Sequence, residues 1–313
     1  MENKQETNPR IAYGAALLEL ARENRDIIAL DADLCMSTQS VQIEKNLPAQ
    51  YLEMGIGEAN MLSVAAGLAL CGKIPFVHSF AVFVAGRAFD QIRQGICLPN
   101  LNVKIVGSSA GLSDFGDGAT HQSFEDMAIM RVLPNMTVLA PVDALEVTKA
   151  VRVAAEIKGP VYIRINRNDM PILTKFDTPF EVGKPLILAE GADVAICVNG
   201  ITASMGLKAR ELLEKGGVSS RVVCFSTIKP LDETAVRLAL AGAKAVITAE
   251  EHSVIGGLSS AILECLSEVP PPVVRIGIND CYGQSAHDYG QLLEHYDLTT
   301  EAIQRAVMRV VGK

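Results

Sequence analysis

The feature that most constrains the fold is an alternation of short, β-branched apolar runs with longer amphipathic segments. The apolar runs in the first half of the chain are IIALDAD, IPFVHSF, VKIVGSS, TVLAPVD and VYIRIN, at residues 27–33, 74–80, 103–109, 137–143 and 161–166. Segments such as AYGAALLELARE and ALEVTKAVRVAAEI lie between them and have the periodicity of helices. Strands that are apolar on both faces and separated by helices predict a parallel sheet covered on both sides, which is an α/β fold.

The pattern breaks once and then starts again. Residues 168–185, NDMPILTKFDTPFEVGKP, carry three prolines and no sustained period, which is typical of a linker or a crossing segment. Further apolar runs follow at residues 193–200, 220–226, 245–251 and 272–278, with helical patterns between them and after Leu298. The sequence therefore predicts two doubly wound, mainly parallel-sheet domains, residues 1–180 and residues 181–313.

Charge, cysteine spacing and hydropathy exclude several classes of protein. The 313 residues carry a formal net charge of −8 without a Lys/Arg block, so nucleic acid is not an expected partner. The seven cysteines lack Cys-x-x-Cys or Cys/His spacing, which predicts reduced core residues and no zinc site. The N-terminus lacks a secretory signal pattern, and apolar stretches such as Ile74–Gly86 are shorter than the roughly 18 residues of a membrane span. We expect a cytoplasmic protein with no membrane contact.

One carboxylate lies where a glycine-flanked turn enters an apolar run of small residues. In MGIGEANM, Glu58 follows Gly57 and precedes the run at residues 62–70. The turn nearly matches the dinucleotide fingerprint, but Asn60 replaces the third glycine and the next run ends in His78-Ser79 instead of an acidic residue, which disfavours nicotinamide binding. Glu58 fits a reaction that holds one proton away from water. The alternative is an exposed carboxylate that only complements the helix dipole.

Two aromatic residues and a histidine are further candidates for a pocket. Phe80 and Phe83 leave the end of a predicted strand three residues apart. They form either a flat aromatic wall for a ligand or part of the ordinary core. His78 precedes them, and it is either a polar group of the same pocket or a buried histidine with satisfied hydrogen bonds.

The loop GDGATHQ, residues 116–122, follows the predicted strand at 103–109. Ligands bind at the carboxyl ends of strands in an open parallel sheet, so this loop is a candidate substrate loop. Asp117 and His121 fit the recognition of a hydroxylated substrate, and His121 can exchange a proton near neutral pH. The alternative is a helix-capping loop, with Ser123 and Asp126 forming the cap.

In this order the motifs resemble the pyrimidine-binding domain of transketolase. The resemblance is carried by GIGEANMLSVAAGLALCGKIPFVHSFAVFVAGRAFDQIR and then by PNLNVKIVGSSAGLSDFGDGATHQSFEDMAIMRVLPNMTVLAPVDALE. The segments VITAEEHSVIGGLSSAI and RIGINDCYG are similar to the C-terminal domain of that enzyme, so the resemblance spans nearly the whole chain. It implies transfer of a two-carbon ketol unit from a ketose to an aldose, with thiamine diphosphate as the cofactor.

The resemblance implies a cofactor-binding group. Glu58, a catalytic residue on this view, would hydrogen-bond the aminopyrimidine ring of thiamine diphosphate. Phe80 and Phe83 would pack on the same ring, and Asp33 would lie near the thiazolium ring.

A substrate-binding group is implied in the same way. Asp117 and His121 would bind hydroxyl groups of the donor sugar, with His121 as the second catalytic residue. The sugar phosphate would be held by Arg10, Ser37 and Arg167, whose guanidinium and hydroxyl groups suit phosphate. Ser109 belongs to this group because it stands where many transketolases have a phosphate-contacting histidine.

Part of the enzyme is missing from the sequence. Transketolases hold the cofactor's diphosphate through Mg²⁺ on a separate domain, whose signature is Gly-Asp-Gly followed later by paired asparagines. Here the only Gly-Asp-Gly is at residues 116–118, and the sequence has no Asn-Asn. The resemblance therefore implies a separate N-terminal subunit that completes the site and mainly holds Mg²⁺, with two copies of each subunit in an α2β2 assembly.

Two departures from the family bear on the substrate. Ser109 replaces the histidine, and Gly86 stands where some transketolases have a third aromatic residue beside the pyrimidine. We therefore expect a branched or modified sugar phosphate, or a sugar whose terminal anion is not phosphate. The rivals are a deoxyxylulose-phosphate-synthase-like enzyme, a 2-oxo acid dehydrogenase β subunit and a non-catalytic scaffold. The missing domain disfavours the synthase, the sugar-phosphate group disfavours the dehydrogenase, and Glu58 disfavours the scaffold.

Overall fold

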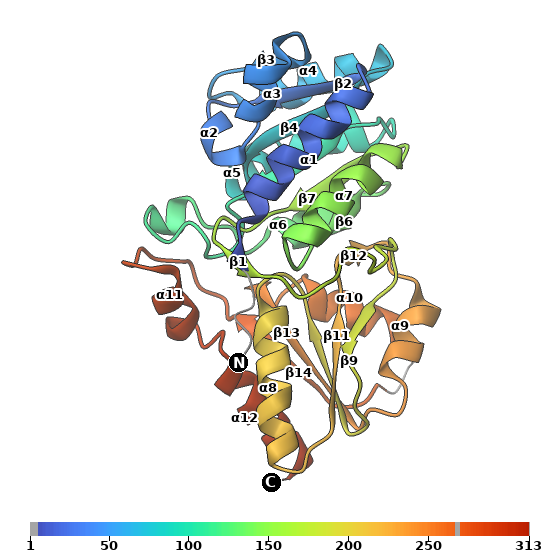
Figure 1. Cartoon of the computed structure of the whole chain (residues 1–313), viewed down its shortest axis with the longest axis vertical. Coiled ribbons are helices and arrows are strands. Elements are labelled where there is room, and N and C mark those ends of the chain that lie inside the picture. Colours follow the sequence, from blue (N-terminus) through green and yellow to red (C-terminus); the bar gives the residue numbers. More distant parts are fainter. Residues whose placement is uncertain (1–5, 267–269, 313) are drawn as a thin grey trace.

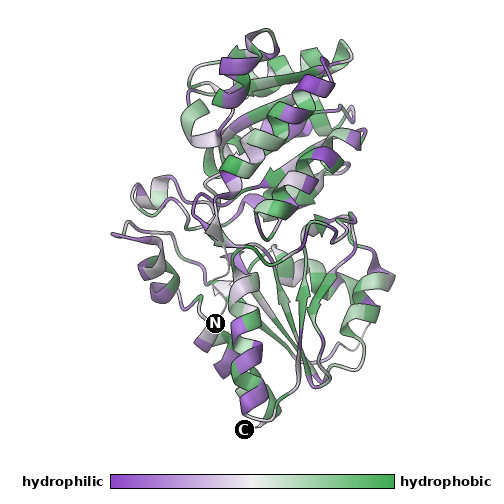
Figure 2. Cartoon of the chain, viewed as in Figure 1, coloured by the Kyte–Doolittle hydropathy of each residue, from purple (hydrophilic) through white to green (hydrophobic). Residues whose placement is uncertain are grey.

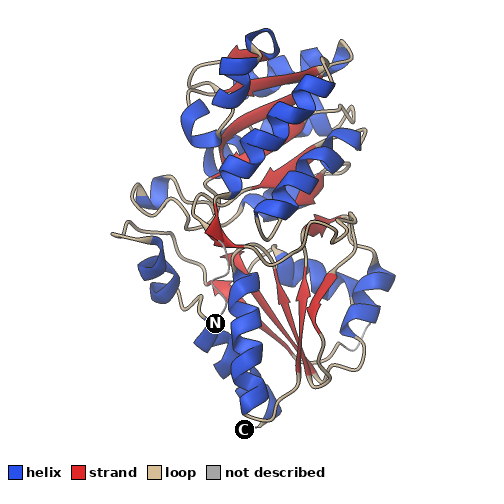
Figure 3. Ribbon diagram, viewed as in Figure 1, coloured by secondary structure: helices blue, strands red, loops and turns tan. Residues whose placement is uncertain are grey.

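Two α/β units lie one above the other along the long axis of the molecule, the N-terminal unit at the top of Figure 1. The computed structural model describes residues 6–266 and 270–312. In both units helices lie on the two faces of a sheet, as Figure 3 shows. The central strands are mostly hydrophobic in Figure 2, because the sheet is covered on both faces. This confirms the predicted fold class of two mainly parallel-sheet α/β domains.

The N-terminal sheet has the strand order β12-β6-β7-β5-β4-β2-β3. Its strands are parallel except for the edge strand β12. Their bounds are Ile27–Asp31 (β2), Tyr51–Glu53 (β3), Ile74–Phe80 (β4), Lys104–Ser108 (β5), Thr137–Leu139 (β6), Val161–Arg164 (β7) and Thr227–Lys229 (β12). Since β2, β4, β5 and β7 run the same way, the segments that follow them meet at one edge of the sheet.

Helices cover both faces of this sheet. On one face α1 (Pro9–Glu23) and α7 (Ala144–Glu156) pack around Tyr13, Leu17 and Val151. On the other face α4 (Glu58–Leu70), α5 (Ala81–Arg87) and a π-helix (Gln91–Cys97) pack around Met61 and Ile92. The remaining helices are short: α2 (Cys35–Thr38), α3 (Val41–Asn46), α6 (Asp126–Arg131) and the 3-10 turns Pro48–Gln50 and Gly118–Thr120. A two-stranded sheet pairs β1 (Glu6–Thr7) with β8 (Met170–Pro171).

The C-terminal sheet has the order β14-β13-β10-β11-β9, with only β9 antiparallel. Its strands are β9 (Leu186–Ala189), β10 (Val194–Val198), β11 (Ser220–Cys224), β13 (Ala245–Ser253) and β14 (Val273–Ile278). Helices α8 (Thr202–Lys215) and α12 (Thr300–Val311) pack on one face of the sheet, where Leu213 and Ile303 are buried. Helices α9 (Glu233–Leu240) and α10 (Leu258–Cys265) pack on the other, while α11 (Tyr289–His295) lies apart (Figure 1).

The two units share a core and a strand. One apolar cluster runs from Met127 and Met130 of α6 to Leu258 and Ile262 of α10. In addition, β12 leaves the C-terminal half of the chain and pairs antiparallel with β6 of the N-terminal sheet. Sequence periodicity does not predict this exchange, because a three-residue strand carries too little pattern.

Other local predictions were wrong. The amphipathic run AGRAFDQIRQGI at residues 85–96 predicts one helix, but this helix is broken, since α5 ends at Arg87 and the π-helix begins at Gln91. All seven cysteines are free, as predicted. Cys71 and Cys281 are exposed, so these two are not the core residues that the sequence predicted, whereas the other cysteines are buried or half-buried. No helix in the described part of the chain is both long and apolar enough to cross a membrane.

Candidate active site

Glu58 is the first residue of α4, yet its side chain is only 5% exposed. Gly55 precedes it with φ +65°, a conformation that glycine adopts without strain, and no side chain caps the helix at Gly57. The Glu58 carboxylate accepts a hydrogen bond from Arg87, with 2.9 Å between Oε1 and Nη1. The carboxylate is therefore buried and paired with Arg87, and not exposed as the helix-dipole alternative described it.

Phe80 and Phe83 form a stacked pair next to this carboxylate. Their ring centroids are 5.9 Å apart with an interplanar angle of 17°. The guanidinium of Arg87 lies over the Phe83 ring, 4.1 Å from its centroid, while it also donates to Glu58. The rings of His121 and Phe83 form a T-shaped pair, with 5.1 Å between their centroids. A flat group with an N–H donor thus fits between Phe83 and Glu58, and in this structure that group is the arginine.

A cavity of about 330 Å³ opens over these residues. It lies at the carboxyl edge of the N-terminal sheet, where β2 and β4 end. Four sequence-predicted residues line it: Asp33, Glu58, Phe83 and His121. The other lining residues are Ala32, Leu34, Ile56, Arg87 and Thr120. Phe80 packs behind Phe83, so the cavity brings the predicted cofactor-binding group together.

The loop at residues 116–122 contributes to the cavity through its end. His121 lines the cavity and its Nδ1 is 2.9 Å from the Thr120 hydroxyl. Asp117 is exposed and does not line the cavity. The helix-capping alternative is wrong, because α6 begins after Glu125 without a side-chain cap, and Asp126 is instead buried against Arg164.

His78 belongs to the core and not to the cavity. Its ring is fully buried, with Nε2 2.5 Å from the Tyr13 hydroxyl and Nδ1 2.8 Å from the Leu30 carbonyl oxygen. Burial lowers the pKa of His78 to about 4, so the ring stays neutral at physiological pH. Of the two alternatives for this residue, the structure shows the buried histidine with satisfied hydrogen bonds.

The predicted anion-binding residues form a second group beside the aromatic pair. Arg167 lies 5.8 Å from the centroid of Phe80, and Arg10 donates through Nη1 to the Ser37 carbonyl oxygen at 2.9 Å. Burial and then the charge of Arg167 lower the pKa of Arg10, so the two guanidinium groups are close enough to repel each other. Arg167 is ion-paired with Asp114. Two cations gathered in this way favour an anionic ligand.

Ser109 and Gly86 have different surroundings. Ser109 is fully buried with φ +52°, and its hydroxyl has no hydrogen-bond partner among the described residues. A buried hydroxyl without a partner is uncommon in folded proteins. Gly86 faces open space, because no described atom outside its chain neighbours and the backbone of its own helix lies within 4 Å of the position that a Cβ would take.

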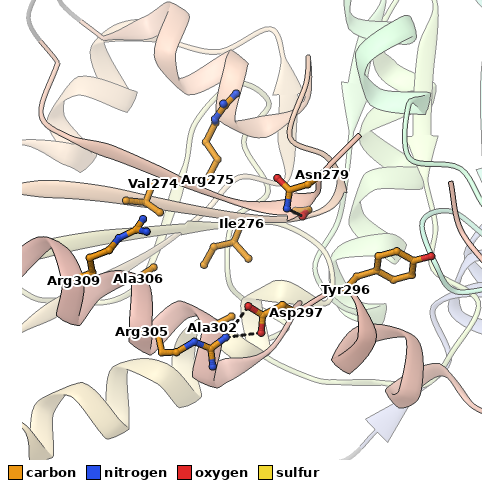
Figure 4. Close-up of a pocket in the computed structure, with 11 residues that line it drawn as sticks. Val274, Arg275, Ile276, Asn279, Tyr296, Asp297, Ala302, Arg305, Ala306 and Arg309 are labelled. Carbon is orange, nitrogen blue, oxygen red and sulfur yellow. Dashed lines mark hydrogen bonds and ion pairs between the residues drawn. The ribbon is translucent and has the colours of Figure 1, made fainter. Parts of the chain in front are cut away.

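A second cavity, of about 370 Å³, lies in the C-terminal domain between β14 and α12. It shares no lining residue with the Glu58 cavity. As Figure 4 shows, Arg305 is paired with Asp297. In the same view Arg275 points away from this pair, and Arg309 is at the other end of the cavity, towards Val274. The arginines therefore do not converge on one point, and the candidate chemistry stays with Glu58.

Comparison with known families assigns both halves of the chain. The transketolase pyrimidine binding domain matches residues 5–172, and the transketolase C-terminal domain matches residues 183–303. The chain belongs to the transketolase family. The Glu58 cavity and the arginine group both lie in the part that matches the pyrimidine binding domain.

Related transketolase subunits match over nearly their full length. A 6-deoxy-6-sulfo-D-fructose transketolase subunit from Clostridium sp. (strain MSTE9) is 42% identical, with 97% of this chain and 94% of that protein covered. An apulose-4-phosphate transketolase subunit from Phocaeicola vulgatus is 37% identical, with 97% of each covered. A solved split gene transketolase, an inactive beta4 tetramer, is 46% identical with a TM-score of 0.89, covering 98% of this chain and 99% of that chain. This transketolase chain therefore corresponds to the C-terminal subunit of split transketolases.

Sequence reasoning missed two charged residues of this candidate site. Arg87 is four residues after Phe83 on α5, a spacing that places both side chains on one helix face. Asp114 lies in the loop before residues 116–122 and pairs with Arg167 across 53 positions of sequence. The helical spacing from Phe83 could have indicated Arg87, whereas the position of Asp114 beside Arg167 depends on a tertiary contact.

Proposed function

We propose that this chain is the C-terminal subunit of a thiamine-diphosphate-dependent transketolase, which moves a two-carbon ketol unit from a ketose to an aldose. The transketolase family uses this cofactor. The observation that carries the proposal is the buried Glu58 carboxylate, which faces the stacked Phe80–Phe83 pair across one cavity. Arg87 already shows that a flat, hydrogen-bond-donating group fits there, so the residues suit an aminopyrimidine ring.

The residues of this chain would bind, orient and exchange protons. When bound, thiamine diphosphate supplies the carbanion chemistry that breaks and forms the carbon–carbon bond. Glu58 would accept a hydrogen bond from the pyrimidine ring, Phe80 and Phe83 would fix the plane of that ring, and Asp33 would lie near the thiazolium ring. Burial strengthens the interaction of Glu58 with the ring because little water competes for the carboxylate.

The substrate would lie between the cofactor and the two arginines. His121 lines the cavity and could exchange a proton with a hydroxyl of the donor sugar, and Asp117 would reach it from the exposed part of the loop. Arg10, Ser37 and Arg167 would hold the terminal anion. The hydroxyl of Ser109, which has no hydrogen-bond partner in the part of the chain that the structure describes, would be a further donor. Two related subunits act, by name, on 6-deoxy-6-sulfo-D-fructose and apulose-4-phosphate, which supports a modified donor sugar.

We infer that a separate N-terminal subunit completes the site, holds Mg²⁺ and the diphosphate, and assembles with this chain as α2β2. A related split transketolase is an inactive beta4 tetramer, which supports the inference that this chain alone is inactive. The experiment is purification of the chain from its own cells, with the native mass, bound thiamine diphosphate and ketol transfer measured together. We expect a stoichiometric second chain, bound cofactor and activity in the complex only. A solitary chain without cofactor would contradict the proposal.

Arg87 makes the contacts that the pyrimidine ring would need, so the cofactor must displace it. We expect Arg87→Ala to bind thiamine diphosphate about threefold to tenfold more tightly, because an ion pair and a cation–π contact no longer compete with the cofactor. Calorimetry on the assembled complex measures this change. Arg93→Ala, an exposed arginine further along, is the control and should leave the affinity unchanged. Weaker binding by Arg87→Ala would mean that Arg87 is itself a ligand of the cofactor.

A further inference from the structure

Asp114 is a buried carboxylate in the middle of the arginine group. It is 3% exposed and forms an ion pair with Arg167. Its position is fixed by the backbone, since its carbonyl oxygen accepts a hydrogen bond from Gln122 at 3.2 Å. The neighbouring Ser113 carbonyl oxygen accepts from Asn168 at 2.9 Å. The loop is thus tied on both sides, and the carboxylate is held against the guanidinium.

The charge of Asp114 reaches both arginines. Besides pairing with Arg167, Asp114 favours the charged form of Arg10. Burial and the charge of Arg167 act in the opposite sense and lower the pKa of Arg10. Asp169 also favours the charged form of Arg10, and the negative charge of Asp117 raises the pKa of Asp114. Arg10 and Arg167, both half-buried, contribute two positive charges, and the buried Asp114 contributes one negative charge, so Asp114 halves the net formal charge of these three side chains.

This balance discriminates between terminal groups of the substrate. A phosphate monoester is mostly a dianion at neutral pH, whereas a sulfonate is a monoanion. The repulsion by Asp114 is twice as large for the dianion at the same position, and burial weakens the screening of that repulsion by salt. The attraction by the arginines also doubles for the dianion, so it is the presence of Asp114 that moves the balance away from a dianion and towards a monoanion.

We propose that Asp114 determines substrate specificity, and that it selects a donor ketose with a singly charged terminal group, such as a sulfonate, over one with a phosphate. This inference rests on the proposed transketolase function and names the substrate class of that site. The aromatic pair gives the geometric link, because Arg167 lies over Phe80 and Phe80 packs on Phe83 at the cavity. The terminal group would therefore bind one side chain away from the cofactor position.

The test compares two donors that differ only in the terminal group, 6-deoxy-6-sulfo-D-fructose and fructose 6-phosphate. For the complex with the partner subunit, kcat/KM for both donors is measured, together with their Kd in the absence of thiamine diphosphate. Wild type should prefer the sulfonate. Asp114→Asn should shift the ratio towards the phosphate by at least about tenfold, because a like-charge contact is removed. Asp177→Asn, an exposed acid outside the group, should leave the ratio unchanged.

The two readouts separate the possible failures. If Asp114→Asn changes neither the kcat/KM ratio nor the Kd ratio of the two donors, or weakens the binding of both donors equally, Asp114 only positions Arg167 and the inference is wrong. If the wild-type complex turns over neither donor but the Kd ratio shifts as expected, the proposed ketol transfer fails while the specificity role of Asp114 stands. A shift in both ratios supports the inference and the function together.

Discussion

Glu58→Gln should abolish ketol transfer by the assembled enzyme while leaving the subunit folded. We expect kcat to fall at least about a hundredfold, as is usual when a positioned acid–base group is removed. Glutamine keeps the size of the side chain but is neutral, so it cannot stabilise positive charge on the pyrimidine ring. Arg87, the partner of Glu58, is half-exposed, so water can replace the lost contact and the fold should tolerate the change. Steady-state kinetics and the native mass of the complex measure both parts.

The matched control for this substitution is Glu190→Gln. Glu190 also pairs with an arginine, Arg221, but it is exposed and lies in the C-terminal domain away from the cavity. We expect wild-type kinetics from this variant. If the wild-type complex is active and Glu58→Gln does not slow it, the assignment of Glu58 is wrong and the buried carboxylate has a structural role.

The sequence predicted the fold well because its dominant signal is local. Buried parallel strands are continuous apolar runs, and each run named from the sequence corresponds to a strand of the structure, such as residues 74–80 for β4. What it did not predict is one pairing of distant segments and one local break in a helix. The exchange of β12 onto β6 and the break between α5 and the π-helix leave no periodic trace.

The candidate site divides in the same way. The positions of Glu58, Phe83 and His121 could be predicted, because each follows the carboxyl end of a strand and parallel strands bring these ends together. The burial of Glu58 fits the expectation of a proton held away from water, but the helix start alone does not predict it, since a glutamate there is ordinarily exposed. Asp114 could not be assigned either, because its meaning depends on Arg167, which is distant in sequence and adjacent in space.

The junction between the two domains is held by a buried polar network. Arg164 of β7 donates through Nε to Asp126 of α6 at 2.9 Å, and through Nη2 to the Glu251 carbonyl oxygen of β13 at 2.7 Å. Tyr162 also donates to Asp126, at 2.9 Å. The Glu251 side chain in turn accepts from the Leu112 amide at 2.7 Å, which ties the junction to the loop of Asp114 and His121. Burial raises the pKa of Glu251 to about 7 despite these hydrogen bonds.

Arg164→Met should therefore destabilise the protein strongly. The side chains of Arg164 and Asp126 are 7% and 0% exposed, so the substitution leaves a buried carboxylate without a counter-ion and the Glu251 carbonyl oxygen without this donor. We expect the free energy of unfolding to fall by about 3–5 kcal/mol, measured by urea denaturation. Arg152→Met is the control: Arg152 pairs with Glu19 and Glu23 at the exposed surface, and its loss should cost less than about 1 kcal/mol. Equal effects of the two substitutions would mean that the Arg164 network, with its contact to the Glu251 carbonyl oxygen, does not hold the domains together, and that the shared apolar core does so alone.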